Sequence, residues 1–247
     1  MPNVKIVLEY DGTDFSGWQK QPKNSTIQEE LEKAIEIILK EKPRRFVASG
    51  RTDAGVHAYG QVANFFIDNT TYLDNLAYGV SSILKNKVAV LSVEIVDDKF
   101  HSTRDAIQKT YLYRILNRPT PPIIDYGFIW HIPRVLDIDF LRKELNCIIG
   151  KHNFESFRSR ACCSNNPVKR IISCEIERNE DYINIRITGE GFLMHMVRII
   201  IGTLIDIHNG RIKLTMKEIL ELQDRTKAGK TAPAYGLFLE KVDYERF

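Results

Sequence analysis

Residues 45–67 read RFVASGRTDAGVHAYGQVANFFI, which predicts two strands joined by a short loop. RFVAS and QVANFFI have the β-branched and aromatic residues typical of strands, and GRTDAGVHAYG lies between them. Gly50, Gly55 and Gly60 allow tight turns and let the backbone approach a ligand closely. The two strands are therefore expected to fix both ends of the loop that presents Asp53.

On its N-terminal side this stretch is preceded by another strand and a helix. Alternating apolar residues predict a strand over Val4–Tyr10, which ends at the turn DGTD. Thr26 and Glu29 have the spacing of a capping box, and apolar residues at helical spacing follow up to Ile38. A second amphipathic helix is predicted over Leu73–Leu84, and the β-prone run KVAVLSVEIV follows it.

The second half of the chain repeats the mixture of strands and helices. KTYLYRIL predicts a strand, DIDFLRKELNCIIG a helix, and SCEIERN with DYINIRIT a hairpin. Apolar residues between Leu193 and Leu204 predict another helix, and YGLFLEKVDY a closing strand. The predicted fold class is α+β, with an N-terminal subdomain over residues 1–105 and a C-terminal one over residues 106–247.

Composition narrows the class of protein. The 247 residues are 43% hydrophobic and 27% charged, which is typical of a globular chain with a core, and the net charge of +3 permits a polyanionic partner. The N-terminus lacks a signal-like pattern and no apolar run is long enough for a membrane span, so we expect a cytoplasmic protein that does not bind membranes. The cysteines have no metal-binding spacing and are expected to be reduced: Cys147, Cys162, Cys163 and Cys174.

The loop residues have two interpretations. Asp53 can be an ordinary turn residue that bonds its own backbone, with Arg51 as a surface cation. Alternatively, the glycines and flanking strands present Asp53 as a catalytic acid.

Several motifs favour the catalytic interpretation, because together the chain resembles the TruA-type tRNA pseudouridine synthases. The resemblance is strongest in GRTDAGVHA (Gly50–Ala58) and continues, in order along nearly the whole chain, through YDGTDFSGWQ, KTYLYRI, NFESFR, FLMHMVRIIIG and GLFLEKVDY.

The resemblance implies a fold, a reaction and site residues. The fold is two subdomains whose antiparallel sheets join into one extended sheet, with flanking helices and a basic central cleft. The reaction isomerises uridine to pseudouridine at tRNA positions 38, 39 and 40 in the anticodon stem-loop, on a homodimer, without metal or cofactor. Asp53 is then the catalytic nucleophile or base, Arg198 the cation that favours its charged form, and Tyr111 a ring that stacks on the uracil.

The residue pattern alone leaves two interpretations open for several of these residues. Helical periodicity places His195 and Arg198 opposite the apolar face, toward a cleft or toward solvent. Tyr111 and Tyr113 share a strand face, so either can be a core residue, and Tyr113 is expected to be one. A last set of residues is expected to contact RNA: Arg51, Phe15, Trp18, Gln19, His57, Arg158, Lys169 and Arg170.

Each of these assignments also has a structural alternative. Phe15 and Trp18 look exposed but can anchor the core, and His57 can position the loop. The basic clusters around Arg44, Arg45 and Arg160 can be solvated surface or can bind phosphates with salt-dependent affinity.

Two other functions fit parts of the sequence. A noncatalytic RNA-binding or RNA chaperone protein could keep the same scaffold. A metal-dependent phosphoryl-transfer enzyme could use Asp11, Asp14 and Asp53 around magnesium, although no phosphate-binding loop motif supports it. Chelator sensitivity and the effect of Asp53→Asn on turnover distinguish these functions.

Overall fold

The computed structural model describes residues 1–245 and divides into two compact units. Unit 1 comprises Met1–Ile107 and the C-terminal segment from Phe238 on, and unit 2 comprises Gln108–Leu237. The predicted α+β class is confirmed, since each unit contains a mainly antiparallel sheet with helices. The closing segment belongs with unit 1, whereas the sequence assigns everything after residue 105 to the second subdomain. The reason is that this segment pairs with a strand of unit 1.

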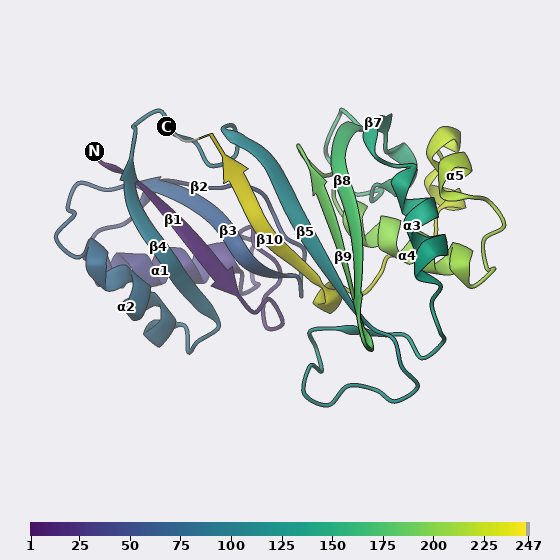
Figure 1. Ribbon diagram of the computed structural model, residues 1–247. Coiled ribbons are helices and arrows are strands. Elements are labelled where there is room, and N and C mark those ends of the chain that lie inside the picture. Colours follow the sequence, from purple (N-terminus) through teal and green to yellow (C-terminus); the bar gives the residue numbers. More distant parts are fainter. Residues whose placement is uncertain (246–247) are drawn as a thin grey trace. The chain divides into compact units, whose positions relative to one another are not determined.

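Unit 1 is a sheet with two helices on one face (Figure 1). Its strand order is β4-β1-β3-β10, with β2 also pairing with β3, and all pairings are antiparallel except that of β3 with β10. The elements are β1 (Asn3–Tyr10), α1 (Ile27–Leu39), β2 (Arg44–Ala48), β3 (His57–Phe66), η1 (Leu73–Asn75), α2 (Leu76–Ile83), β4 (Val88–Val96) and β10 (Leu237–Tyr244).

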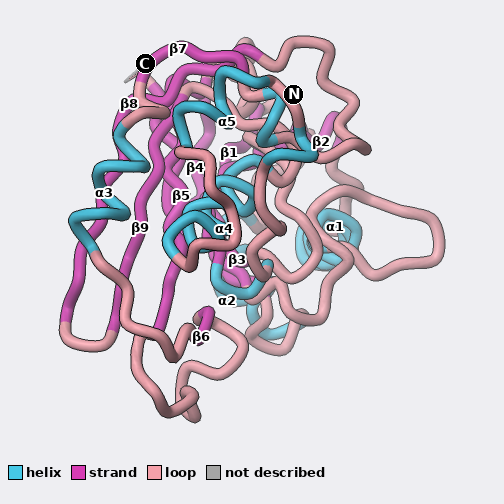
Figure 2. The backbone as a smooth tube through the Cα atoms, turned by 90° about the vertical axis from the view of Figure 1, so that its right-hand side faces the viewer, coloured by secondary structure: helices cyan, strands magenta, loops and turns pink. Residues whose placement is uncertain are grey.

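Unit 2 has the strand order β5-β9-β8-β7, all antiparallel, with β6 added in parallel to β5. Figure 2 shows β8 and β9 running side by side, and α3 packs against β8. The elements are β5 (Ala106–Leu116), β6 (Trp130–His131), α3 (Ile138–Asn146), β7 (Gly150–Asn153), η2 (Glu155–Phe157), β8 (Val168–Asn179), β9 (Tyr182–Gly189), α4 (Met196–His208), α5 (Met216–Leu222), η3 (Arg225–Lys227) and η4 (Ala234–Gly236).

Three local predictions are corrected. β3 begins at His57, because His57 already pairs with Phe238 of β10 and Ala58 with Tyr10 of β1. The Thr26 side chain makes no capping hydrogen bond at α1, so the predicted capping box is wrong there. α4 begins only at Met196, since His195 has a left-handed backbone with φ of 63°.

Within the described chain, no helix has both the length and the apolar character of a membrane span. The four cysteines are unpaired, as predicted.

Candidate active site

The loop that carries Asp53 connects β2 to β3. The Asp53 carbonyl oxygen accepts a hydrogen bond from the Val56 N–H at 3.1 Å, which closes a turn, and Gly55 takes the left-handed φ of 74° that this turn requires. Asp53 is half-buried and Arg51 is exposed. The turn therefore fixes the backbone that bears the carboxylate.

A second loop, residues 11–19, lies directly against the Asp53 loop. The Trp18 N–H donates to the Thr52 carbonyl oxygen at 3.1 Å. A Cβ atom at Gly17 would lie 2.8 Å from that same oxygen, and one at Gly12 would lie 2.0 Å from the Val56 oxygen. Only glycine fits at these two contacts, so the motifs YDGTDFSGWQ and GRTDAGVHA meet backbone to backbone.

Buried polar side chains fix the other sides of the Asp53 loop. The Tyr10 hydroxyl and Thr52 Oγ1 are hydrogen-bonded at 2.8 Å, and Gln61 Nε2 donates to the Gly50 carbonyl oxygen at 3.0 Å. Ser49 Oγ in turn donates to Gln61 Oε1 at 2.7 Å. Burial raises the pKa of Tyr10 above its usual range, so its phenol stays neutral. Such bonds hold a reacting group in one geometry before substrate binds.

Two residues expected to contact RNA are buried instead. The exposed aromatic pair predicted in FSGWQ is wrong for Trp18, which is 2% exposed and packs its ring 5.9 Å from that of Tyr10. His57 is 1% exposed, and its Nδ1 accepts the Gly12 N–H at 3.1 Å. Both side chains therefore hold the two loops together, which is the structural alternative considered for them.

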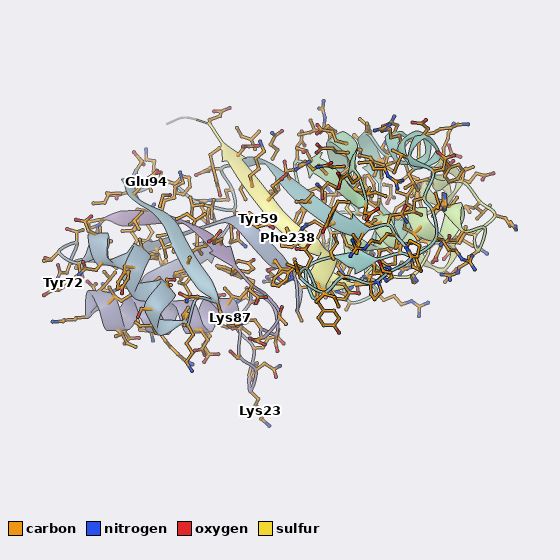
Figure 3. The ribbon with its side chains drawn as sticks, turned by 60° about the horizontal axis from the view of Figure 1, so that its bottom comes forward. Lys23, Tyr59, Tyr72, Lys87, Glu94 and Phe238 are labelled. Atoms are coloured by element: carbon orange, nitrogen blue, oxygen red, sulfur yellow. The ribbon has the colours of Figure 1, made fainter. Side chains whose placement is uncertain are left out.

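The remaining candidates in this loop region are more accessible. Phe15 is half-buried, and Gln19 is half-buried with its Nε2 donating to Gln28 Oε1 at 3.1 Å. On the other side of His57, Phe238 stacks on the His57 and Tyr59 rings at 4.8 Å each. Figure 3 shows Tyr59 and Phe238 together. The closing strand thus supports the start of β3, directly after the Asp53 loop.

Two of the carboxylates that the metal-dependent alternative would place around magnesium form ion pairs with a lysine. Asp11 and Asp14 each place an oxygen 3.0 Å from Lys87 Nζ. Burial raises the pKa of Asp11, but hydrogen bonds from Thr13 and Lys87 outweigh this effect and lower it. Among residues 1–245, no group of three or more His, Cys, Asp or Glu side chains is arranged to hold a metal ion.

Unit 2 carries the two tyrosines of KTYLYRI. Tyr113 is fully buried, as predicted, and its hydroxyl donates to the Pro233 carbonyl oxygen at 2.9 Å. Burial raises the pKa of Tyr113 well above its usual value. Tyr111, on the same strand face, is 8% exposed and meets the Phe192 ring edge-on at 5.0 Å. Phe192 thus fixes the plane of the Tyr111 ring.

Arg198 lies in the first turn of α4. Its Nε donates to the Ala232 carbonyl oxygen at 2.9 Å, and the Ala232 N–H donates back to the Arg198 carbonyl oxygen at 3.0 Å. The same segment is fixed to α4 by Gly229 N–H to Thr203 Oγ1 at 2.9 Å and by Lys230 N–H to Asp206 Oδ2 at 3.2 Å. Arg198 is therefore held at a defined position and is not a mobile surface side chain.

The prediction that His195 and Arg198 share one face of a helix is wrong. Since His195 precedes the helix, it does not share a helical face with Arg198. Moreover, α4 is buried on nearly all sides from Met196 to Ile207, so it has no solvated face of the kind considered for it. Arg198 is the exception, being only half-buried.

Sequence reasoning assigned no role to Lys109 or Phe192. Lys109 lies two residues before Tyr111 on the same face of β5, and burial lowers its pKa below the usual lysine value. A strand period of two, applied to KTYLYRI, would have placed Lys109 on the tyrosine face. No sequence signal identified Phe192 as the partner of Tyr111.

The predicted basic residues of unit 2 have different environments. Two donor nitrogens of Arg158 bind within the protein, with Nε 2.8 Å from Glu155 Oε1 and Nη1 2.9 Å from the Ser164 carbonyl oxygen. Arg160 is exposed, Lys169 is half-buried on β8, and Arg170 is exposed with Glu190 at 3.8 Å. Lys169 and Arg170 lie on a strand, whereas Arg158 has a clear structural role.

Comparisons with known proteins identify the chain's relatives. A family model described as tRNA pseudouridine synthase matches residues 6–103 and 146–245, which include Asp53 and Arg198. A protein named tRNA pseudouridine synthase A from Neorickettsia sennetsu is 43% identical over 97% of this chain and 99% of its own length. Proteins of the same name are 46% identical in Ehrlichia chaffeensis, over 97% of this chain and 99% of theirs, and 41% identical in Thermoanaerobacter sp., over 99% and 100%.

These matches confirm the enzyme class expected from the sequence motifs, an isomerase that forms pseudouridine in tRNA. Since the family model spans most of the chain and the relatives span nearly all of it, the chain belongs to the tRNA pseudouridine synthase family.

Proposed function

We propose that this protein converts uridine to pseudouridine at positions 38, 39 and 40 of the tRNA anticodon stem-loop, with Asp53 as its catalytic carboxylate. The observation that supports this role most strongly is the packing of the Asp53 loop against residues 11–19, where backbone meets backbone at Gly12 and Gly17. Firm positioning of a reacting group raises the reaction rate strongly, because a misplacement of about 1 Å can lower the rate about a hundredfold.

The reaction needs one carboxylate and no change in oxidation state. The bond from C1′ to N1 of uridine breaks, the uracil turns, and a bond from C1′ to C5 forms. The proton on C5 leaves to solvent, and N1 gains one. Asp53 can begin the reaction by attacking C1′ as a nucleophile or by removing a ribose proton as a base, and both roles require its charged form.

Tyr111 and Arg198 take part in the same reaction in this proposal. An aromatic ring supports a base that has left its helical stack, and stacking contributes about 1–3 kcal/mol per base. Tyr111 suits this role because Phe192 fixes its plane. Arg198 suits the role of a positioned cation because Ala232 fixes its guanidinium through Nε.

The other parts of the proposal concern partners and location. Arg51, Lys169 and Arg170 contact the RNA backbone, with Phe15 and Gln19 near the catalytic loop, whereas Trp18, His57 and Arg158 act by positioning other residues. The protein works as a homodimer in the cytoplasm, as the family resemblance implies. A noncatalytic RNA-binding protein on this scaffold remains the second candidate.

Tritium release from tRNA labelled at uridine C5 tests the proposal. Wild-type protein in EDTA should release tritium, and Asp53→Asn should release essentially none while binding tRNA with unchanged affinity. Asp14→Asn, which removes another carboxylate of unit 1, should retain release. Anticodon stem-loops with a single labelled uridine at position 38, 39 or 40 should all be substrates.

Each part of the proposal can fail separately. Release by Asp53→Asn would remove Asp53 from the chemistry. Loss of release in EDTA and in Asp14→Asn would instead mean that the isomerisation depends on a metal ion held by carboxylates of unit 1. Binding without release by the wild type would support the noncatalytic protein, and release only from uridines elsewhere would overturn the assigned positions.

A further inference from the structure

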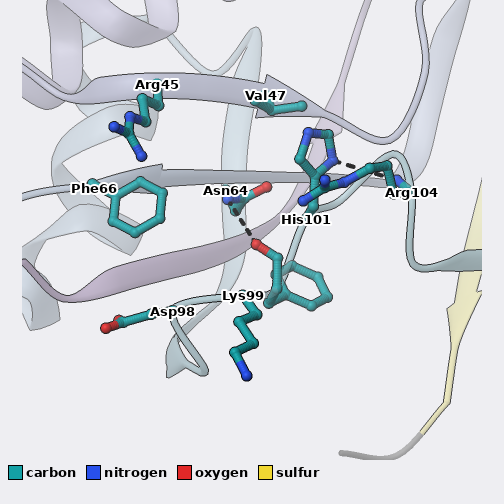
Figure 4. Close-up of a pocket in the computed structure, with 9 residues that line it drawn as sticks. Arg45, Val47, Asn64, Phe66, Asp98, Lys99, His101 and Arg104 are labelled. Atoms are coloured by element: carbon teal, nitrogen blue, oxygen red, sulfur yellow. Dashed lines mark hydrogen bonds between the residues drawn. The ribbon is translucent and has the colours of Figure 1, made fainter.

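Unit 1 has a pocket of about 470 Å³ that the catalytic proposal does not use. Its lining comes from β2, β3 and the segment 98–104 (Figure 4): Arg45, Val47, Asn64, Phe66, Asp98, Lys99, Phe100, His101 and Arg104. None of these residues belongs to the Asp53 loop: Asn64 and Phe66 lie seven and nine residues after His57 along β3, and Val47 lies six residues before Asp53, a span of at most about 20 Å at about 3.3 Å per residue. The pocket is therefore a separate site.

Three cations of the pocket are available to a ligand. Arg45, Lys99 and Arg104 are all exposed, and none of them forms an ion pair among the described residues. Asp98 is the only acidic side chain in the lining. The excess of positive charge favours an anionic ligand, and guanidinium groups suit phosphate oxygens in particular.

The backbone turns Arg45 toward the pocket at the cost of a strained conformation. The pairing of β2 with β3 shifts register between Arg44 and Val47, which forms a bulge, and Arg45 there has a left-handed φ of 50°. Bulges of this kind redirect side chains, and strain in non-glycine residues is concentrated at functional sites. The Arg45 guanidinium lies 5.8 Å from the centre of the Phe66 ring.

The segment 98–104, which forms one wall of the pocket, is held in place by hydrogen bonds within the protein. Asn3 Nδ2 donates to the Phe100 carbonyl oxygen at 2.9 Å, and the Ser102 N–H donates to Asn64 Oδ1 at 2.9 Å. The Ser102 and Thr103 hydroxyls donate to the Val47 and Ala48 carbonyl oxygens of β2 at 2.9 and 2.6 Å. The segment therefore presents Lys99 and Arg104 without a further cost of ordering the backbone.

His101 adds a hydrogen-bond donor. Its Nδ1 accepts the backbone N–H groups of Thr103 and Arg104 at 3.2 and 3.3 Å. A neutral imidazole with an accepting Nδ1 carries its proton on Nε2, which can donate to an oxygen. Cations, an aromatic ring and a fixed donor together are the chemistry that binds a phosphate beside a base.

We propose that this pocket binds the sugar–phosphate backbone of the RNA substrate at a place separate from the catalytic loop, with Arg45, Lys99 and Arg104 on its phosphates. The ligand class rests on the proposed function, because that function supplies the RNA. The site contributes affinity for the body of the RNA and takes no part in the chemical step.

Binding of an unmodified full-length tRNA transcript, measured by filter retention over a series of KCl concentrations, tests this site. The triple variant Arg45→Gln, Lys99→Gln, Arg104→Gln should weaken binding at least about tenfold at low salt. The slope of log affinity against log salt should fall by about two, since each phosphate contact contributes about 0.7–0.9. Tritium release at saturating tRNA should stay within about twofold of the wild type.

Two further variants guard against nonspecific effects. Asp98→Asn removes the only carboxylate of the lining and should strengthen binding, an effect that misfolding cannot produce. Lys42→Gln removes an exposed cation three residues from Arg45 but outside the pocket, and should leave affinity and slope unchanged.

Unchanged affinity and slope in the triple variant would overturn the inference, as would equal weakening by Lys42→Gln. Failure of the catalytic proposal would look different, because wild-type protein would then release no tritium while the salt slopes still separated the variants.

Discussion

At the scale of single residues, glycines 12 and 17 explain the position of Asp53 better than the loop's own glycines do. A turn alone fixes only the local backbone, whereas the second loop fixes the turn against β1 and α1. This contact was beyond sequence reasoning, because nothing in YDGTDFSGWQ indicates which backbone atoms it meets. Asp53 was a candidate because its loop lies between two predicted strands, and the resemblance carried by GRTDAGVHA favoured a catalytic role for it.

Gly12→Ala should therefore reduce turnover far more than an ordinary surface substitution. The new Cβ would lie 2.0 Å from the Val56 carbonyl oxygen, and since that atom is backbone, the loop bearing Asp53 must shift. We expect tritium release to fall about a hundredfold or more, with a destabilisation of about 1–3 kcal/mol measured by urea unfolding.

Gly79→Ala is the matched control in the same unit. Its Cβ would meet Ile38 Cδ1 at 2.8 Å, the far end of a flexible side chain that can move aside. Activity should be retained and α2 slightly stabilised by the better helix propensity of alanine. Equal activity of Gly12→Ala and Gly79→Ala would show that the contact between the two loops does not position Asp53.

At the scale of elements, the sequence predicted most helices and strands because their apolar periodicity is strong. The errors lie at element ends, where tertiary contacts decide. β3 starts at His57 because its pairing with β1 reaches Ala58, and α4 starts at Met196 because His195 leaves the helical conformation. The short α5 was missed, although Thr215 and Glu218 form a true capping box there.

Substitution of the threonines before α1 and α5 should have opposite effects on stability. Thr26 Oγ1 is buried without a hydrogen-bond partner among the described residues, whereas Thr215 Oγ1 accepts the Glu218 N–H at 3.3 Å. Thr26→Val should leave stability unchanged or raise it by up to about 1 kcal/mol, because a buried unsatisfied hydroxyl is removed. Thr215→Val should cost about 1 kcal/mol, because a cap is lost.

Urea unfolding followed by circular dichroism measures both changes in the full chain. A loss of about 1 kcal/mol in Thr26→Val would mean that Thr26 caps α1 in solution, as the sequence pattern suggests.

At the scale of the whole molecule, the division of the chain was foreseen only in part. The change of pattern after residue 105 locates the first boundary, near Ile107. The return of the closing strand to unit 1 was not predictable, since YGLFLEKVDY is a strand pattern without information about its neighbour. Its parallel pairing, Phe238 with His57 and Leu239 with Ala58, joins the two ends of the sequence in one sheet.

Unit 1 should therefore need the closing strand to fold. Removal of the strand would expose the edge of β3 and the faces of His57 and Tyr59, on which Phe238 stacks. The Tyr244 hydroxyl would no longer donate to the Ser102 carbonyl oxygen at 2.7 Å. Burial of Phe238 and Leu239 contributes about 1.5–3 kcal/mol each, a large part of the roughly 5–15 kcal/mol that typically stabilises a domain.

A fragment of residues 1–107 should accordingly unfold at much lower urea, with a broad transition, than the same fragment joined to residues 237–247 through a Gly/Ser linker of about 20 residues. A joined fragment with Phe238→Ser and Leu239→Ser keeps the added length but loses the apolar contacts, and it should behave like the short fragment. If residues 1–107 alone unfolded as sharply and at the same urea concentration as the joined fragment, the closing strand would be an accessory to a unit that already folds. In that case, the support that Phe238 gives to the start of β3 would matter to the Asp53 loop and not to the stability of unit 1.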